Sequence, residues 1–284
     1  MNKNTLQVAG MTALAMIAFA ANSLLCRLAL REGHIDATSF TLLRIASGAL
    51  MLWLIVRMRG GAAPLAGDWL SAFALFAYAA GFSFAYLTLP AGAGALLLFG
   101  AVQATMIGYG LWRGERLRIV QWLGLALAFA GLVALLLPGL SAPPLGGALL
   151  MIAAGIAWGV YSLRGRGVRN ATASTAGNFV RALPFAAGLG ILMSFGAADA
   201  HVDTLGVVYA LASGALASGL GYAVWYAALP GLKAASTATV QLSVPVIAGI
   251  GAAIFLGEAI TVTLVLICAA VLAGIAMVVL GRRG

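Results

Sequence analysis

Residues 261–280 read TVTLVLICAAVLAGIAMVVL, twenty positions without a single charged side chain. A helix of about 20 apolar residues is long enough to cross the hydrocarbon core of a bilayer. Glu258 precedes this stretch and Arg282 follows it, so the charges stand just outside the apolar run. The stretch therefore predicts a transmembrane helix.

The rest of the chain has a similar composition. Of its 284 residues, 63% are hydrophobic and 8% are charged, whereas a soluble domain carries about 25% charged residues. Continuous apolar runs, about twice the length of a membrane β-strand, argue against a barrel. They predict an all-α polytopic membrane protein of ten spans with no room for a soluble domain. The expected spans lie near 7–28, 38–56, 69–89, 91–112, 119–137, 145–163, 174–195, 205–229, 234–256 and 261–280.

The loop charges predict the orientation. If the N-terminus is cytoplasmic, the opposite side receives only Arg27 and Arg31. The cytoplasmic side then receives Lys3, Arg57, Arg59, Arg113, Arg116, Arg118, Arg164, Arg166, Arg169, Lys233, Arg282 and Arg283. Cytoplasmic loops of membrane proteins are rich in Lys and Arg. We therefore expect both termini in the cytoplasm, and we interpret the net charge of +9 as topology rather than as nucleic-acid binding.

A cleaved signal peptide is an alternative for the first span. Lys3, the apolar stretch and Ala18-Phe19-Ala20 resemble a signal peptide with its cleavage site. Cleavage would leave nine spans and would remove a segment that an internal repeat requires, so we favour ten spans.

That repeat is visible in two short motifs. Tyr86-Leu87-Thr88-Leu89-Pro90 matches Tyr226-Ala227-Ala228-Leu229-Pro230, and Gly114-Glu115 matches Gly257-Glu258. The chain is predicted to be two copies of five spans, residues 1–142 and 143–284, joined near Pro143-Pro144. Because five is odd, the second copy is inverted relative to the first. Inverted repeats are typical of transporters that work by alternating access around a site near the midplane.

On these residues the chain resembles the drug/metabolite transporter superfamily, in its EamA-type ten-helix branch. The specific part is the tail of each half: Gly114-Glu115, Gln121, Gly124 and Gly131 in the first, and Pro245-Val246, Gly257-Glu258, Thr261 and Gly274 in the second. Val102 and Ile267 depart from the pattern. The resemblance implies that spans 1–4 and 6–9 surround a central cavity while spans 5 and 10 pack at the periphery. The tyrosine-rich interior is most similar to the aromatic amino-acid and paraquat exporters.

Aromatic side chains at helical spacing predict part of the cavity lining. A lipid-facing surface has little use for tyrosine hydroxyls away from the interfaces, and residues three or four apart share a helix face. The candidates are Tyr78, Phe82 and Tyr86 in span 3, Trp158 and Tyr161 in span 6, and Tyr222 and Trp225 in span 8. For Tyr86, Tyr161 and Tyr226, near their helix ends, the interfacial aromatic belt is an equal alternative.

Uncharged polar residues complete the candidate site. Asn22, Gln103 and Gln241 lie well inside spans 1, 4 and 9, where such side chains either line a cavity or join helices. Arg44 and Arg181 occupy corresponding positions in the two halves, nearer a helix end than the centre. Because long basic side chains reach from there to the interface, we expect these two arginines to act as gating or helix-end residues.

The carboxylates predict the mechanism. They are Glu32, Asp36, Asp68, Glu115, Asp199, Asp203 and Glu258, and all fall at span ends or in loops. Proton-coupled export normally uses an acidic group inside the membrane. A facilitative carrier is therefore favoured, with Glu115 and Glu258 as gating or helix-end residues.

Other chemistry is not indicated. The chain has no GxxxxGK[ST] motif, HExxH motif or nucleophile elbow. Cys26 and Cys268 sit alone in apolar stretches, which predicts packing rather than a metal site. His34 and His201 fall in predicted external loops. We expect no enzyme activity, no cofactor and no metal.

The sequence thus predicts a monomeric carrier in a bacterial plasma membrane that exports amino acids, aromatic and other neutral ones, and related metabolites by alternating access. Two alternatives remain open. One is a proton-coupled multidrug or nucleotide-sugar carrier, and the other is an intramembrane enzyme or scaffold without transport.

Overall fold

The computed structural model describes residues 3–60, 66–136, 143–195, 201–232 and 240–280, which form helices joined by short loops. In chain order these are α1 (Lys3–Arg31), α2 (Ala37–Met58), α3 (Trp69–Ala85), α4 (Ala91–Trp112), α5 (Ile119–Leu136), α6 (Leu145–Arg164), α7 (Ala171–Ser194), α8 (Thr204–Leu211), the π-helical segment η1 (Ala212–Leu220), α9 (Gly221–Ala228), the short 3₁₀ turn η2 (Leu229–Gly231), α11 (Ser243–Leu256) and α12 (Val262–Leu280).

The predicted fold class is confirmed: the chain is an all-helical, multi-pass membrane protein. Eight helical segments of the described residues are long and apolar enough to cross a membrane, and Trp69–Ala85 and Ser243–Leu256 are shorter apolar helices. Each of the ten expected ranges coincides with one of these segments. Residues 234–239 of the ninth range lie outside the described residues.

Helix capping accounts for three of the carboxylates at the ends of the spans. The side chains of Asp36, Asp68 and Asp203 accept hydrogen bonds from the backbone amides of the first turns of α2, α3 and α8, and Asn170 does so for α7. These amides have no partner within their helix, so the capping side chains satisfy them. None of the described helices contains a carboxylate.

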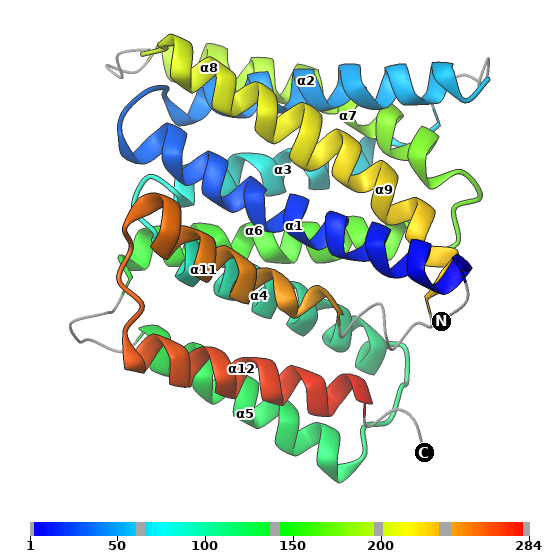
Figure 1. Cartoon of the computed structure of the whole chain (residues 1–284), viewed down its shortest axis with the longest axis vertical. Coiled ribbons are helices and arrows are strands. Elements are labelled where there is room, and N and C mark those ends of the chain that lie inside the picture. Colours follow the sequence, from blue (N-terminus) through cyan, green and yellow to red (C-terminus); the bar gives the residue numbers. More distant parts are fainter. Residues whose placement is uncertain (1–2, 61–65, 137–142, 196–200, 233–239, 281–284) are drawn as a thin grey trace.

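The helices run side by side and alternate in direction, so the bundle has two chemically different ends (Figure 1). One end holds the start of α1 and the end of α12, and we call it the basic end. Its described cations are Arg57, Arg59, Arg113, Arg116, Arg118, Arg164, Arg166 and Arg169. The opposite end holds Arg27 and Arg31 together with Glu32, Asp36, Asp203 and Glu258. Asp199, Lys233, Arg282 and Arg283 lie outside the described residues.

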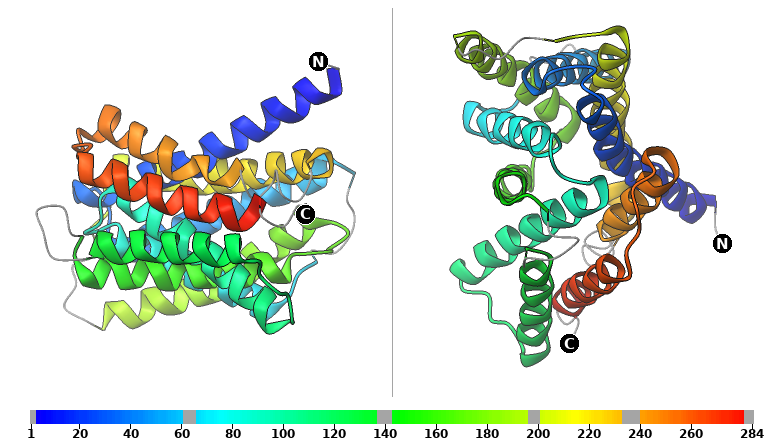
Figure 2. Two further views of the ribbon diagram at one scale, coloured as in Figure 1. Left: turned by 90° about the horizontal axis from the view of Figure 1, so that it is seen from below. Right: turned by 90° about the vertical axis from the view of Figure 1, so that its left-hand side faces the viewer.

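Three of the helix pairs in contact join elements that occupy the same position in the two halves of the chain. Helix α5 packs against α12, α2 against α7, and α4 against α11. Glycine permits the first of these contacts, because a Cβ at Gly274 would collide with the carbonyl oxygen of Gly124. Figure 2 shows α5 and α12 together at one edge of the molecule, away from α1, α2 and α3. This place at the edge agrees with the arrangement that the family resemblance implies, but the cavity lining departs from it, because α12 contributes Val278 and Val279 to the lining and α2 contributes no residue.

One local feature departs from the expected regular span at 205–229. The chain is π-helical from Ala212 to Leu220, between α8 and α9. Gly214 lies here against α2, and a Cβ on it would meet the backbone oxygen of Arg44 and the hydroxyl of Ser47. Such π-helical turns inside longer helices are frequent at functional sites. The segment brings the backbone of this span into direct contact with the helix that carries Arg44.

Candidate functional site

A cavity of about 950 Å³ lies among α1, α3, α4, α6, α7, η1, α9 and α12. Along α3 its lining runs from Asp68 to Phe82, which is roughly 20 Å of helix at 1.5 Å per residue. At the basic end the lining includes exposed residues of the turns after α4 and α6, among them Arg113, Glu115 and Arg166. The cavity therefore opens at the basic end. Its volume is within the range of small-molecule sites.

Aromatic rings form much of the cavity wall. Trp158 of α6 stacks on Tyr161 and on Tyr222, with ring centroids 5.3 Å apart in both pairs. Its ring also lies 4.8 Å from that of Tyr78 on α3. Phe19 of α1 contacts the ring of Tyr222 at 5.6 Å. Four separate segments thus contribute to one continuous aromatic surface, suited to a flat apolar group.

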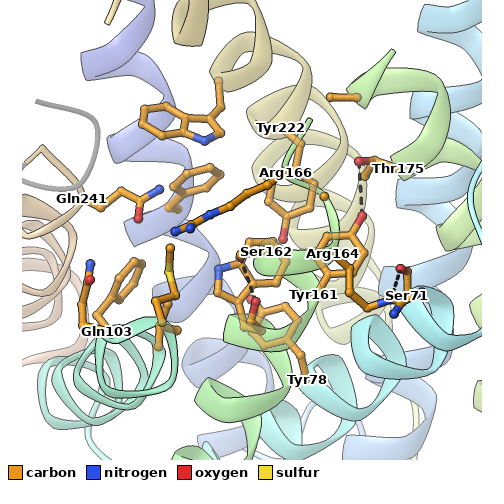
Figure 3. A pocket seen from close by; sticks show the side chains of 18 of the residues that line it. Ser71, Tyr78, Gln103, Tyr161, Ser162, Arg164, Arg166, Thr175, Tyr222 and Gln241 are labelled. Carbon is orange, nitrogen blue, oxygen red and sulfur yellow. Dashed lines mark hydrogen bonds between the residues drawn. The ribbon is translucent and has the colours of Figure 1, made fainter. Parts of the chain in front are cut away.

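The structure brings together nine of the ten candidate binding residues. The residues that line this cavity are Asn22, Tyr78, Phe82, Gln103, Trp158, Tyr161, Tyr222, Trp225 and Gln241. Figure 3 shows the side chains of Gln103 and Gln241 on one side and Tyr78, Tyr161 and Tyr222 on the other. The side chain of Arg166 projects into the space between them. The two amides thus stand across the cavity from the aromatic rings.

Tyr86 is the exception. It shares the i, i+4 spacing of Tyr78 and Phe82, but it follows the last residue of α3 and is not part of the cavity lining. Its side chain is fully buried, and its hydroxyl donates to the carbonyl oxygen of Ala91 at 3.3 Å. Tyr86 therefore packs at the start of α4, in neither the cavity nor an interfacial belt.

Tyr161 and Tyr226, unlike Tyr86, line the cavity. Their hydroxyls share a hydrogen-bonded network. The hydroxyl of Thr175 bridges them, at 3.2 Å from that of Tyr161 and 3.1 Å from that of Tyr226. Asn178 adds a weaker contact from its Nδ2 to the Tyr161 hydroxyl at 3.4 Å. The polar edges of these two rings are fixed by α7.

Arg44 does not reach a helix end as expected. Its side chain is buried inside the bundle with 2% of its surface exposed. One guanidinium nitrogen, Nη2, donates to the hydroxyl of Tyr78 at 2.9 Å. The guanidinium carbon lies 4.7 Å from the ring centre of Phe82 and 5.1 Å from that of Tyr78. Arg44 thus supports the cavity wall from behind, since it is not itself a lining residue.

Arg181, its counterpart in the second half, is placed differently. Its Nη1 donates to the carbonyl oxygens of Ala66 and Gly177 at 3.0 and 3.1 Å. These contacts fasten α7 to the segment before α3. The two arginines therefore occupy corresponding sequence positions but have different partners.

Glu258 and Arg27 form a cluster at the opposite end of the bundle. The Nε of Arg27 lies 3.3 Å from Oε1 of Glu258, and its Nη1 donates to the carbonyl oxygens of Tyr86 and Leu87 at 2.9 and 3.1 Å. The second oxygen of Glu258 accepts from the backbone amide of Ala91, the first residue of α4. One cluster thus joins α1, the end of α3, the start of α4 and the end of α11. None of its side chains lines the cavity.

The mouth at the basic end has an ion pair of its own. Arg164 donates to Asp68 at 2.9 Å and to the hydroxyl of Ser71 at 3.0 Å, which links α6 to α3. Partial burial acts to raise the pKa of Asp68, but hydrogen bonds from Ser71 and Arg164 outweigh it and hold the pKa below its ordinary value. Asp68 is therefore ionised at neutral pH. Glu115 lines the same mouth.

In the part of the chain that the structure describes, no group of three or more His, Cys, Asp and Glu side chains could hold a metal ion. Cys26 is buried and Cys268 is half-buried, and both are free thiols. His34 pairs with Asp203 at 2.7 Å, so one of the two loop histidines has a specific contact.

Comparison with known proteins agrees with this architecture. The profile of the EamA-like transporter family matches residues 145–280. Residues 145–280 therefore form a domain of the EamA-like transporter family. Members of this family are membrane transporters. An uncharacterised protein of Pseudomonas aeruginosa is 58% identical over 275 residues, which cover 96% of this chain and 95% of that protein. A protein of known crystal structure shares the fold with a TM-score of 0.65 at 22% identity, covering 95% of this chain and 99% of its own.

Several residues of this EamA-like site are not apparent from sequence patterns. Thr175, Asn178 and Ser218 line the cavity although nothing in their spacing singles them out. The sequence predicts Arg27 as one of two basic residues at the end of the spans opposite the basic loops. This isolated position is the signal that could have identified Arg27 as a functional residue. Its partner Glu258 is 231 residues away, so no local pattern pairs them.

Proposed function

We propose that this EamA-like protein is an alternating-access transporter that exports amino acids, aromatic and other neutral ones, and related metabolites. The observation that carries the proposal is the aromatic cavity, which opens at the basic end and ends short of the Arg27–Glu258 cluster. A cavity that is open at one end and closed at the other corresponds to one state of an alternating-access cycle.

The charge asymmetry supports an orientation. The basic end carries eight described arginines and the opposite end two, and basic loops face the cytoplasm. In a bacterial plasma membrane, the inner membrane of a Gram-negative cell, both termini would then be cytoplasmic and the cavity would open inward. A solute made in the cytoplasm could enter it directly, which is what an exporter requires.

The helix packing supports two inverted halves, residues 1–142 and 143–284. The pairs α2 with α7, α4 with α11, and α5 with α12 each join one helix of the first half to its counterpart in the second. A pseudo-two-fold axis in the membrane plane that relates the two halves would bring each of these helices next to its counterpart. We propose the monomer as the transport unit, because the two halves of one chain supply both repeats of an alternating-access architecture.

The wall chemistry supports the substrate class. Stacked rings of Trp158, Tyr161 and Tyr222 would hold a flat side chain, and the amides of Gln103 and Gln241 would bind polar groups without charge. We assign substrate binding to these residues and to Asn22, Tyr78, Phe82 and Trp225. This wall is also the basis for grouping the protein with aromatic amino-acid exporters.

The distribution of acids supports facilitative transport. Within the described residues, the carboxylates of the cavity lining are Asp68 and Glu115, both at its mouth. No carboxylate of the residues that the structure describes lies deep in the cavity, where proton and substrate could compete for it. The solute would therefore move down its own gradient.

Counterflow in proteoliposomes tests this proposal. Vesicles that contain the purified protein and unlabelled L-phenylalanine should accumulate labelled L-phenylalanine transiently, and protein-free vesicles should not. The same assay should be run with tyrosine, tryptophan, leucine and alanine in both directions. Absence of counterflow for every amino acid would rule out the proposed substrate class.

A nucleotide-sugar or related phosphorylated substrate is the second candidate. Arg113, Arg164 and Arg166 line the cavity mouth, and arginine clusters favour phosphate groups. Inhibition of phenylalanine counterflow by a nucleotide sugar, or counterflow of the nucleotide sugar itself, would support this candidate. Inhibition by a cationic dye would instead point to a multidrug carrier.

A further inference from the structure

Arg44 is a buried cation without a buried anion. Its side chain is 2% exposed, and none of the carboxylates in the described residues forms an ion pair with it. Its Nη1 has no hydrogen-bond partner among those residues. A buried charge of this kind is costly unless an opposite charge compensates it. The rings of Tyr78 and Phe82 provide only part of that compensation through cation–π contact.

The effect of Arg44 reaches the cavity through Tyr78. The Tyr78 oxygen accepts from Nη2 of Arg44 at 2.9 Å and from Nδ2 of Asn22 at 3.3 Å. The Asn22 amide is itself oriented, because its Oδ1 accepts from the hydroxyl of Ser213 at 2.6 Å. Side chains from α1 and α2 thus donate to the Tyr78 oxygen, and Ser213 of η1 orients one of these donors.

This arrangement leaves Tyr78 as a hydrogen-bond donor. A phenol can accept as well as donate, and here two donors occupy its oxygen. No acceptor for the phenolic hydrogen is found among the described residues, while Tyr78 lines the cavity. The phenolic hydrogen is therefore left for an acceptor that enters the cavity, and the Arg44 guanidinium lies directly behind the phenol oxygen. Charge-assisted hydrogen bonds of this type favour an anionic acceptor.

Charge along the rest of the cavity has the same sign. Among the charged residues of its lining, Arg164 neutralises Asp68, which leaves Arg113 and Arg166 against Glu115 at the mouth. Aromatic walls can also attract cations. Here, however, the guanidinium of Arg44 already lies against Tyr78 and Phe82, so a second cation at these rings would be repelled.

We propose that Tyr78, with Arg44 as its positioning residue, forms an anion subsite that makes the cavity selective for aromatic carboxylates over amines of the same shape. The carboxylate accepts the Tyr78 hydrogen bond, and the aromatic group of the substrate lies against Trp158. An α-amino group is tolerated but not required. This inference rests on the proposed function for its aromatic substrate class, and it adds the charge that the substrate must carry.

Calorimetric titration of the purified full-length protein tests the subsite with three probes of one skeleton. These are 3-phenylpropionate (carboxylate only), 2-phenylethylamine (amine only) and L-phenylalanine. We expect saturable binding of 3-phenylpropionate and L-phenylalanine, with 2-phenylethylamine at least roughly 10-fold weaker. Equal or tighter binding of the amine, or no binding of either carboxylate, would overturn the proposal.

Two variants separate the subsite from general stability. Tyr78→Phe keeps the ring and should weaken 3-phenylpropionate roughly 10- to 100-fold, while Tyr209→Phe on α8, outside the cavity, should not. Arg44→Met should lower the carboxylate-to-amine selectivity ratio, and Arg44→Lys should retain part of it. Arg57→Lys on the same helix is the matched control. A selectivity ratio unchanged in both Tyr78→Phe and Arg44→Met contradicts the proposal even if overall affinity falls.

The same probes distinguish this inference from the proposed function. Suppose that the protein catalyses counterflow of L-phenylalanine, and that 2-phenylethylamine and 3-phenylpropionate inhibit it equally well. This result would support the proposed transport function and reject the anion subsite. Selective binding of 3-phenylpropionate without counterflow of any amino acid would support the anion subsite and reject the proposed transport function.

Discussion

Arg27 and Glu258 form an ion pair, with 3.3 Å between Nε and Oε1, at the end of the bundle remote from the cavity mouth. Their side chains are 12% and 15% exposed, so the pair is largely shielded from water. Glu258 also accepts from the amide of Ala91, and Arg27 donates to two carbonyl oxygens beyond α3. Because these bonds join four helix ends, we infer that they hold the opposite end closed while the basic end is open.

Replacing Glu258 should open that end. Glu258→Gln removes the charge that pairs with Arg27 and should shift the population towards states open at the opposite end. Cys26 is fully buried beside Arg27, and the chain has two cysteines, so a Cys268→Ala background leaves Cys26 as the sole thiol. We expect several-fold faster modification of Cys26 by a polar maleimide in Glu258→Gln. The control is Glu32→Gln, which removes an exposed pair with Arg31 at the same end. Equal rates in the two variants would show that the Arg27–Glu258 pair is not a closure.

Proton coupling should be absent. In proteoliposomes, a pH gradient without a solute gradient should drive no accumulation of L-phenylalanine, because the described carboxylates of the cavity lie at its mouth. Counterflow by Glu115→Gln should persist. Uptake driven by the pH gradient alone, and lost in Glu115→Gln or Glu258→Gln, would show instead that a carboxylate exchanges a proton for the substrate.

The helices are predictable from sequence because their signal is local. A run such as residues 261–280 is long, apolar and uncharged, and nothing distant in the chain alters its helical state. The π-helical segment at Ala212–Leu220 is not predictable in this way. Its small residues suit any helix, and the irregular geometry accompanies the close contact of Gly214 with the backbone of α2, which is a tertiary effect.

The candidate site is predictable only where helical spacing carries the information. Tyr78, Trp158 and Tyr222 share faces with other aromatic residues, and they meet in the cavity. The same spacing includes Tyr86, but that residue lies outside the cavity lining, because α3 ends at Ala85 and the lining on this helix ends at Phe82. The contact between Arg44 and Tyr78 joins two helices, so the charge behind the cavity wall appears only in three dimensions.

Gly214 should be intolerant of a side chain. A Cβ there would overlap the backbone oxygen of Arg44, which cannot turn away as a flexible side chain could. Gly214→Ala should therefore lower the stability of the purified protein by about 1–3 kcal/mol, as for other overpacked sites. Gly188→Ala in α7, where a Cβ meets nothing within 4 Å, should be neutral or slightly stabilising. Similar melting temperatures for the two variants would contradict the close contact between α2 and η1.

The Asp68–Arg164 pair should make stability depend on acid pH. Asparagine caps helices about as well as aspartate, so Asp68→Asn tests mainly the charge. Because the folded pKa of Asp68 lies below the ordinary value, its contribution is present above about pH 4 and is lost as the pH falls through the folded pKa. Wild type should melt above Asp68→Asn at neutral pH by the equivalent of about 0.2–1 kcal/mol, since the Asp68 side chain is 49% exposed. That difference should shrink as the pH falls below about 4, because the wild-type carboxylate takes up its proton. Arg164→Met should reduce the effect of Asp68→Asn at neutral pH without abolishing it, because the hydrogen bonds from Ser71 to the Asp68 carboxylate remain. A difference that stays constant from neutral to acid pH would show that the charge of Asp68 does not stabilise the contact between α3 and α6.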